Sequence, residues 1–157
     1  MKQRVVIVIL ALMVAVGYVR AAEPRIIPLP RSIELMDGVC RIEQGMKIGC
    51  CDEELLPAAR YLAEHLNIGI TRSGGVVRLT VDDTLGTEQY SVVVSEDGVV
   101  ISGGDYGGVF NAITTLLQLC PEGVYDDSCT LPIGIPFCEI EDQPHWSHRG
   151  FMLDVCR

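Results

Sequence analysis

The segment Tyr90-Ser-Val-Val-Val-Ser-Glu-Asp-Gly-Val-Val-Ile-Ser-Gly103 decides the fold that we predict for this chain of 157 residues. Both apolar halves of the segment are rich in β-branched residues, which favour β-strands. The Glu96-Asp97-Gly98 stretch between them is typical of a hairpin turn. We therefore expect two paired strands here, and these strands should form the centre of a sheet together with a third strand over residues 76–81.

Two helices are predicted, one before and one after these strands. Residues 57–66 combine helix-forming side chains, a proline suited to the first turn and an apolar face, and Asn67 and Gly69 supply the stop. Residues 109–119 carry apolar side chains at helical spacing. Both helices should cover the same face of the sheet, which is an α+β arrangement.

Shorter elements are expected nearer the ends of the chain. Residues 32–36 are predicted to form a strand that ends at an Asp37-Gly38 turn, and residues 39–48 are predicted to pair back with it as a hairpin. Residues 131–136 contain two prolines and are predicted to be a stiff extended connection. A domain boundary is expected near Pro144.

The N-terminus has the pattern of a secretory signal, with a basic start, an apolar run over residues 5–19 and cleavage expected after Ala21. A membrane anchor is the alternative, but a spanning helix needs ~20 apolar residues and Arg20 closes this run. Cleavage removes three basic residues and no acidic one, so the formal charge changes from −9 to −12. We expect an exported protein, periplasmic or secreted, with no nucleic acid partner and no membrane span after signal cleavage.

Seven cysteines are present, which is an odd number, and their spacing fits no small disulfide scaffold. Most are expected to be buried small hydrophobic residues. One bridge among Cys120, Cys129 and Cys138 stays open as an alternative, because these three flank one loop. The chain has no C-x-x-C or C-x-x-H pair, so we predict no metal site.

Two patterns that suggest chemistry are predicted to be structural instead. Residues 103–108 read Gly-Gly-Asp-Tyr-Gly-Gly between a strand and a helix, where a phosphate loop would lie. The spacing does not give G-x-G-x-x-G, and no Gly-Lys-Ser/Thr follows, so the glycines are expected to serve a tight turn. The acidic pairs Asp82-Asp83 and Glu141-Asp142 are predicted to lie in a turn and at a junction, and neither is expected to be a catalytic pair.

Residues 140–157 resemble the junction in family 20 glycoside hydrolases, the β-N-acetylhexosaminidases, where a small N-terminal domain meets the catalytic (β/α)8 barrel. An acidic pair and a proline precede Arg149-Gly-Phe-Met-Leu-Asp154 and Arg157, which match the family's R-G-x-x-L-D-x-x-R pattern. The resemblance also runs upstream in family order. It implies three parts: a signal peptide at 1–21, a non-catalytic α+β domain with a mixed sheet and two helices on one face at 22–143, and the first strand of a truncated TIM barrel at 144–157.

The resemblance implies a function as well. The intact protein would be a hydrolase that removes terminal non-reducing N-acetylhexosamine residues from glycans by substrate-assisted retaining catalysis, with no metal or organic cofactor. The family's catalytic Asp-Glu pair belongs to a later barrel strand, so this chain is expected to hold no catalytic residue and to be inactive alone. Arg149 is implied to bind hydroxyl groups of the sugar, which suits a planar guanidinium, and an ion pair with Asp154 or Glu141 is the alternative. Asp154 and Arg157 are implied to be supporting charges near the pocket.

Two other functions stay open. One is a freestanding carbohydrate-binding or interaction module without catalysis, and the other is a related exo-glycosidase family that carries a similar small domain. The R-G-x-x-L-D pattern favours family 20 over the related families. Trp146 is expected to pack at the domain junction, although a single exposed Trp can also be a platform for a sugar.

Overall fold

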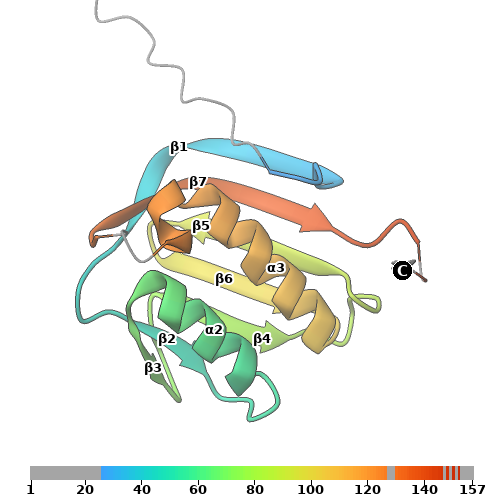
Figure 1. Ribbon diagram of the computed structural model, residues 1–157, viewed down its shortest axis with the longest axis horizontal. Helices are drawn as coiled ribbons and strands as arrows, with labels where there is room; N and C mark the ends of the chain where they lie inside the picture. Colours follow the sequence, from blue (N-terminus) through green and yellow to red (C-terminus); the bar gives the residue numbers. More distant parts are fainter. Residues whose placement is uncertain (1–25, 127–129, 147, 149, 151, 153–157) are drawn as a thin grey trace, which may run out of the picture.

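The structure is a computed structural model that describes residues 26–126, 130–146, 148, 150 and 152. The described strands form one mixed seven-stranded sheet. Figure 1 shows the α-helices on one face of this sheet, which confirms the predicted α+β fold. The elements are β1 (Ser32–Ile42), β2 (Lys47–Cys50), α2 (Leu56–Leu66), β3 (Gly69–Thr71), β4 (Val77–Val81), β5 (Tyr90–Ser95), β6 (Gly98–Gly103), α3 (Tyr106–Leu119), a 3-10 turn η1 (Glu122–Tyr125) and β7 (Ile133–Asp142).

The strands lie in the spatial order β1-β7-β5-β6-β4-β2-β3. Antiparallel pairing joins β1, β7, β5 and β6, whereas parallel pairing joins β6, β4, β2 and β3. The sheet is therefore antiparallel on one side and parallel on the other, and β6 belongs to both halves. The first and last strands, β1 and β7, are neighbours at the antiparallel edge (Figure 1).

The predicted hairpin over residues 90–103 is confirmed as β5 and β6. Val94 pairs with Val99, and Ser95 pairs with Gly98 across the turn. Burial alternates along both strands, since one set of side chains faces the helices and the next faces away. The buried set lies under α3 at the centre of the core: Tyr90, Val92, Val94, Val99 and Ile101.

Both helices follow the predicted apolar faces. The buried residues of α2 are Ala58, Ala59, Leu62 and Leu66, and the helix ends at Asn67 in the left-handed conformation. The other helix, α3, begins at Tyr106, three residues earlier than predicted. Asp105 explains the earlier start, because its carboxylate accepts a hydrogen bond from the backbone N–H of Gly108 at 2.8 Å and caps the helix.

The glycines before and within the first turn of α3 permit close packing, as predicted. A Cβ atom added to Gly103 would overlap with the backbone N of Val109, and one added to Gly108 would overlap with the carbonyl oxygen of Gln89. These atoms belong to the backbone and cannot move aside like a flexible side chain. The helix therefore lies against β6 at a distance that only glycine allows.

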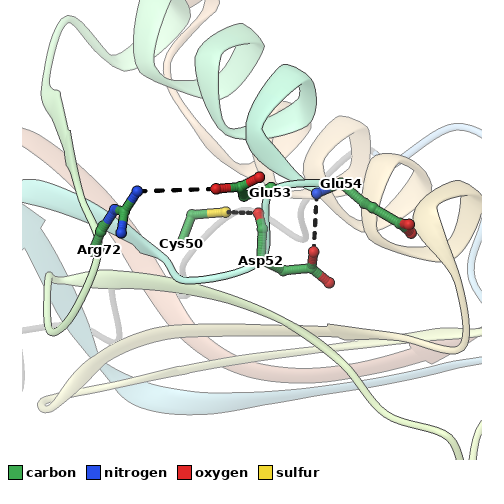
Figure 2. A network of polar contacts seen from close by, with 5 residues as sticks. All are labelled: Cys50, Asp52, Glu53, Glu54 and Arg72. Carbon is green, nitrogen blue, oxygen red and sulfur yellow. Dashed lines mark hydrogen bonds and ion pairs between the residues drawn. The ribbon is translucent and has the colours of Figure 1, made fainter.

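The connection from β2 to α2 is held by local polar contacts (Figure 2). The Asp52 carboxylate accepts a hydrogen bond from the Glu54 N–H at 2.9 Å, and the Cys50 thiol donates to the Asp52 carbonyl at 3.3 Å. Glu53 and Arg72 form an ion pair at 3.9 Å with both side chains exposed. Such an exposed pair contributes little to stability, so the turn itself depends on the contacts of Asp52.

The hairpin predicted for residues 32–48 is wrong. Residues 32–42 form one continuous strand, β1, which pairs with β7 through a register shift between Leu35 and Val39. Gly38 (φ 133°) lies at this irregularity, and the chain continues in the same direction because residues 39–42 also pair with β7. The ring of Phe137 occupies the space that a side chain at position 38 would need. The next strand, β2, lies on the far side of the sheet.

The extended connection predicted for residues 131–136 is also partly wrong, because β7 already begins at Ile133. Pro136 is tolerated inside this strand for two reasons. On one side it lies opposite Val39, at the register shift of β1, and on the other side the pairing of β7 with β5 covers only Cys138 to Asp142. The proline therefore lies where the pairing with β1 is already irregular and where pairing with β5 has not begun.

The described cysteines are mostly buried, as predicted. Cys40, Cys50, Cys120 and Cys138 are buried, whereas Cys51 is exposed. Burial raises the pKa of the Cys138 thiol to about 11. Cys129 lies outside the described residues, so the possible bridge stays a prediction. No helix in the described part of the chain is long and apolar enough to cross a membrane.

Substitution of Gly103 by Ala should destabilise the domain by about 3 kcal/mol, because the added methyl group must displace the backbone of α3 from β6. The free energy of unfolding, measured by urea denaturation, tests this. Gly69→Ala is the matched control, since its methyl group would meet only the Lys47 side chain at 3.8 Å and should change stability by less than about 0.5 kcal/mol. Equal losses for the two variants would contradict the close-packing account.

Candidate functional site

Two cavities meet where the chain leaves the sheet after β7. The first has a volume of about 590 Å³ and lies between the segment before β1, one side of α3 and the residues after β7. The second is open, with about 1020 Å³, and lies between the 86–88 loop, the start of α3, residues 143–146 and His148. Gln143, Pro144, His145 and Trp146 line both cavities.

A partly buried polar network lines the first cavity. The Tyr90 hydroxyl lies 2.7 Å from Thr115 Oγ1 on α3 and donates to Asp142 Oδ2 at 3.3 Å. The other carboxylate oxygen of Asp142 accepts from the backbone N–H of Arg31 at 3.2 Å. Asp142 thus links the end of β7 to the centre of the sheet, to α3 and to the segment before β1. We call Tyr90, Thr115, Asp142 and the Arg31 backbone the exit network.

The environment of Tyr90 keeps its hydroxyl neutral. Burial of the side chain raises the pKa of Tyr90 to about 12, and the nearby Asp142 carboxylate adds to the rise. A neutral phenol is what the network requires, because the hydroxyl must donate a proton to Asp142. The group is therefore a structural hydrogen-bond donor and is poorly suited to act as a base at neutral pH.

The amide side chains of Gln118 and Gln143 connect the segment before β1 to α3 and to the residues after β7. Gln118 on α3 accepts a hydrogen bond from the Ile27 N–H at 2.8 Å. When the amide of Gln143 is oriented with its oxygen towards Arg31, this oxygen accepts hydrogen bonds from both terminal nitrogens of the Arg31 guanidinium, at 2.6 Å and 3.1 Å. The start and the end of the described domain are thus held side by side against α3.

Aromatic residues form the rim of the cavities. The Trp146 side chain is 68% exposed, and its ring meets the His145 ring edge-on at a centroid distance of 4.9 Å. Tyr106, at the start of α3, is 42% exposed and lines the second cavity. Most of the Trp146 surface is accessible within the described residues, and the part of the chain against which it would pack at a domain junction lies outside them, so that expectation stays a prediction.

The described residues offer contacts for a ligand but no arrangement for hydrolysis. Asp105 is committed to capping α3 and also accepts from the Glu88 N–H. Asp82 accepts from the Thr84 N–H and hydroxyl, which holds the pKa of that carboxyl below its usual range and confirms that it lies in a turn. Glu141 is exposed on β7. Among the described residues no three His, Cys, Asp or Glu side chains are placed to hold a metal ion.

The site residues predicted from the sequence lie outside the described residues. This applies to Arg149, Asp154 and Arg157, so their roles stay predictions. The sequence reasoning missed the exit network, although it singled out Glu141-Asp142 as a junction pair. One available signal was Thr115, a hydroxyl on the otherwise apolar inner face of α3, which requires a buried hydrogen-bond partner.

Comparison with known families and proteins gives one consistent result. Residues 23–143 match the family model for glycosyl hydrolase family 20, domain 2. A β-hexosaminidase from Porphyromonas gingivalis is 36% identical over 145 residues, which cover 84% of this chain and 19% of that protein. A β-N-acetylhexosaminidase from Cellulomonas fimi is 29% identical over 148 residues, which cover 84% of this chain and 28% of that protein. The chain therefore spans less than a third of the length of these relatives.

Solved structures agree with the sequence comparisons. The N-acetyl-β-hexosaminidase of Streptomyces plicatus superposes with a TM-score of 0.73 at 30% identity, and the match covers 79% of this chain and 27% of that one. An exo-β-N-acetylglucosaminidase of Vibrio harveyi superposes with a TM-score of 0.69 at 25% identity over 79% of this chain and 20% of its own.

Removal of the Tyr90 hydroxyl should weaken the domain. Tyr90→Phe is expected to lower the free energy of unfolding at pH 7 by about 1–2 kcal/mol, because Thr115 and Asp142 lose a buried partner. Tyr106→Phe is the control and should change stability by less than about 0.5 kcal/mol, since Tyr106 is partly exposed.

The same variant should change the response to alkali. The folded state binds the Tyr90 proton more tightly than the unfolded state does, so wild-type stability should fall as the pH rises from 10 towards 12. Tyr90→Phe should reduce this fall, and Cys138, present in both proteins, cancels in the comparison. Urea denaturation at pH 7, 10 and 11.5 measures both effects. Parallel pH profiles for the two proteins would contradict the buried network.

Proposed function

Because the chain belongs to glycosyl hydrolase family 20, we propose that it is the non-catalytic N-terminal domain of an exported β-N-acetylhexosaminidase. The observation that supports this is the match of residues 23–143 to domain 2 of the family, together with relatives named as β-hexosaminidases that are several times longer. We place the signal peptide at residues 1–21, the domain at 22–143 and the start of the catalytic part at 144–157.

The proposal assigns the chemistry to the polypeptide beyond this domain. The Streptomyces plicatus and Vibrio harveyi relatives are named as acting on N-acetylhexosamines, which supports the same substrate class here. Glycoside hydrolysis requires an acidic group at the leaving oxygen and a nucleophile or base at the anomeric carbon. The substrate-assisted mechanism that the resemblance implies takes its nucleophile from the 2-acetamido group of the sugar, and it needs no metal or cofactor.

In this proposal the domain anchors the segment that leads to Arg149. Asp142 is fixed by the exit network, and Arg149 follows it after a short stretch. We propose that Arg149 binds sugar hydroxyl groups and that Asp154 and Arg157 support it. A planar guanidinium that holds two neighbouring hydroxyl groups must be placed accurately, so a firm anchor just upstream suits this role.

Activity measurements on two proteins test the proposal. The polypeptide encoded by the complete reading frame should release 4-nitrophenol from 4-nitrophenyl N-acetyl-β-D-glucosaminide, whereas the 157-residue chain alone should show no turnover above buffer. In the long protein, Arg149→Ala should lower kcat/KM by at least about tenfold, because the lost contacts act in the transition state. Arg72→Ala is the control, since Arg72 makes only an exposed ion pair.

The proposal fails if the complete polypeptide does not cleave N-acetylhexosaminides, or if the chain alone does. A long enzyme that is active but indifferent to Arg149→Ala would leave the family function standing and would remove the role of Arg149.

The first cavity favours a second candidate function, a carbohydrate-binding module. Its volume of about 590 Å³ suits a small sugar, and its lining joins the exposed Trp146 ring to amide and hydroxyl groups of Asn111, Thr114 and Gln118. An aromatic surface beside planar polar side chains can recognise a sugar, because the ring packs against C–H groups while the amides bond hydroxyls.

Binding measurements on the 157-residue chain separate the two candidates. Calorimetric titration with N-acetylglucosamine oligomers should show negligible binding if the chain is only a non-catalytic domain. Saturable binding that Trp146→Ala abolishes and Tyr125→Ala preserves would favour the binding module. Binding that survives Trp146→Ala would place the sugar elsewhere and would exclude this cavity.

A further inference from the structure

Both backbone ladders of β7 stop where the chain leaves the sheet. The pairing of β7 with β5 ends at the pair of Tyr90 and Asp142. Its pairing with β1 ends one residue earlier, at the pair of Ser32 and Glu141. Within the described residues, no strand of the sheet pairs with the chain after Asp142. Side chains therefore set the direction in which the chain leaves the domain.

The Asp142 carboxylate continues the contact with the segment before β1. In the register of the β1–β7 ladder, Arg31 is the next residue opposite Asp142, because Ser32 pairs with Glu141. The Arg31 N–H donates to Asp142 Oδ1 at 3.2 Å. A side-chain oxygen thus holds the two segments together for one residue beyond the last backbone pair.

The second carboxylate oxygen of Asp142 is held from the side of β5. It accepts a hydrogen bond from the Tyr90 hydroxyl at 3.3 Å, and this hydroxyl lies 2.7 Å from Thr115 Oγ1 on α3. Tyr90 and Thr115 are each only 5% exposed. Asp142 is therefore fixed between the segment before β1 and the buried centre of the domain.

The next two residues extend this anchor. When the Gln143 amide is oriented with its oxygen towards Arg31, this oxygen accepts from both terminal nitrogens of the guanidinium. Pro144 has a fixed φ angle, and it restricts the backbone of Gln143 to extended conformations. The chain that leads towards Arg149 thus begins with two residues that have little conformational freedom.

Stability alone does not require polar groups at Tyr90 and Thr115. A buried hydrogen bond contributes little net free energy compared with well-packed apolar side chains of the same shape. Apolar side chains, however, cannot hold the Asp142 carboxylate in one orientation, whereas a satisfied polar network specifies a single arrangement. The network is therefore better suited to fixing the exit of the chain than to strengthening the core.

The accuracy that a sugar contact demands gives this anchor a purpose. A slip of one residue along a strand displaces the following chain by about 3.3 Å. A misplacement of about 1 Å can lower the rate of an enzyme by about a hundredfold. Because residues 143–148 alone separate Asp142 from Arg149, an error at the anchor has a short path to the guanidinium.

We propose that Tyr90 and Arg31 are positioning residues for Arg149, and that they act by clamping Asp142 and Gln143 at the exit of the domain. The proposal rests on the proposed function, which assigns the sugar contact to Arg149. Neither Tyr90 nor Arg31 touches the sugar. They set the geometry in which the guanidinium meets the hydroxyl groups, so their loss should act on the transition state through Arg149.

The mobility of the exit segment provides the first test. Trp146 is the single tryptophan of the chain and follows shortly after Asp142, so its time-resolved fluorescence anisotropy in the 157-residue chain reports on this segment. Tyr90→Phe and Arg31→Ala should each raise the amplitude of its nanosecond motion by at least about 1.5-fold, because each removes one side of the clamp. Arg41→Ala removes another exposed arginine of the β1 edge and is the control, with no change expected. Equal amplitudes in wild type, Tyr90→Phe and Arg31→Ala would overturn the proposal.

A double-mutant cycle in the complete polypeptide tests the path through Arg149. Tyr90→Phe alone should lower kcat/KM for 4-nitrophenyl N-acetyl-β-D-glucosaminide by at least about fivefold. In the Arg149→Ala background the same change should lower kcat/KM by less than about twofold, because the group that the clamp positions is absent. Losses that multiply, or an enzyme indifferent to Tyr90→Phe or to Arg149→Ala, would overturn the proposal.

A destabilised variant distinguishes positioning from reduced stability. Ile48 is fully buried in β2, on the parallel side of the sheet, and Ile48→Val should cost stability of the same order as the loss of one buried hydrogen bond. At a temperature where both variants are folded, Ile48→Val should keep kcat/KM within about twofold of wild type. A loss equal to that of Tyr90→Phe would overturn the proposal.

Arg31→Ala keeps the cycle informative if Tyr90→Phe does not fold, because the Arg31 side chain is exposed and its removal leaves the core intact. The same dependence on Arg149 is expected, and independent losses would overturn the proposal.

The two kinds of measurement separate this proposal from the proposed function. An active enzyme in which the losses of Tyr90→Phe and Arg149→Ala are independent would reject the positioning role and leave the function standing. A complete polypeptide that cleaves no N-acetylhexosaminide, together with a looser Trp146 in both clamp variants, would reject the function and leave the anchor at the exit standing.

Discussion

The close contact between α3 and the β5–β6 hairpin is the constraint on which the rest of this domain depends. Ile113, Leu116 and Leu117 are fully buried against the central strands, and this is possible because glycines at the strand-to-helix turn let the two backbones approach. The exit network is built on the same contact, since Thr115 lies on the inner face of α3. The same helix begins with Tyr106, which lines the second cavity.

The sequence predicted the parts of the fold that depend on local pattern. The hairpin over residues 90–103 and the helix over residues 57–66 were predictable, because alternation, turn residues and helical periodicity act over a few neighbours. The one wrong hairpin shows the limit of this reasoning. Asp37-Gly38 has the composition of a turn, but the residues on both sides of it pair with β7, which is distant in the sequence, and the chain stays extended.

The candidate site was predictable only through resemblance. The R-G-x-x-L-D pattern pointed to Arg149 and to the family, whereas nothing local distinguishes the carboxylate of Asp142 from that of its neighbour Glu141. Their roles diverge because successive side chains of a strand point to opposite faces. Asp142 therefore reaches the Tyr90 hydroxyl, while Glu141 faces solvent. Such a difference depends on pairing between β7 and β5, which a single sequence does not display.

The pairing of β1 with β7 also bears on how the chain acquires its structure during synthesis. Among the described strands, β1 pairs with β7 alone, and contacts such as that between Arg31 and Asp142 join residues that are 111 positions apart. While the ribosome is still making the middle of the domain, the first strand has no partner and its edge stays open. The pairing of β1 can form only after β7 has emerged, so this edge of the sheet is completed late in the translation of the domain.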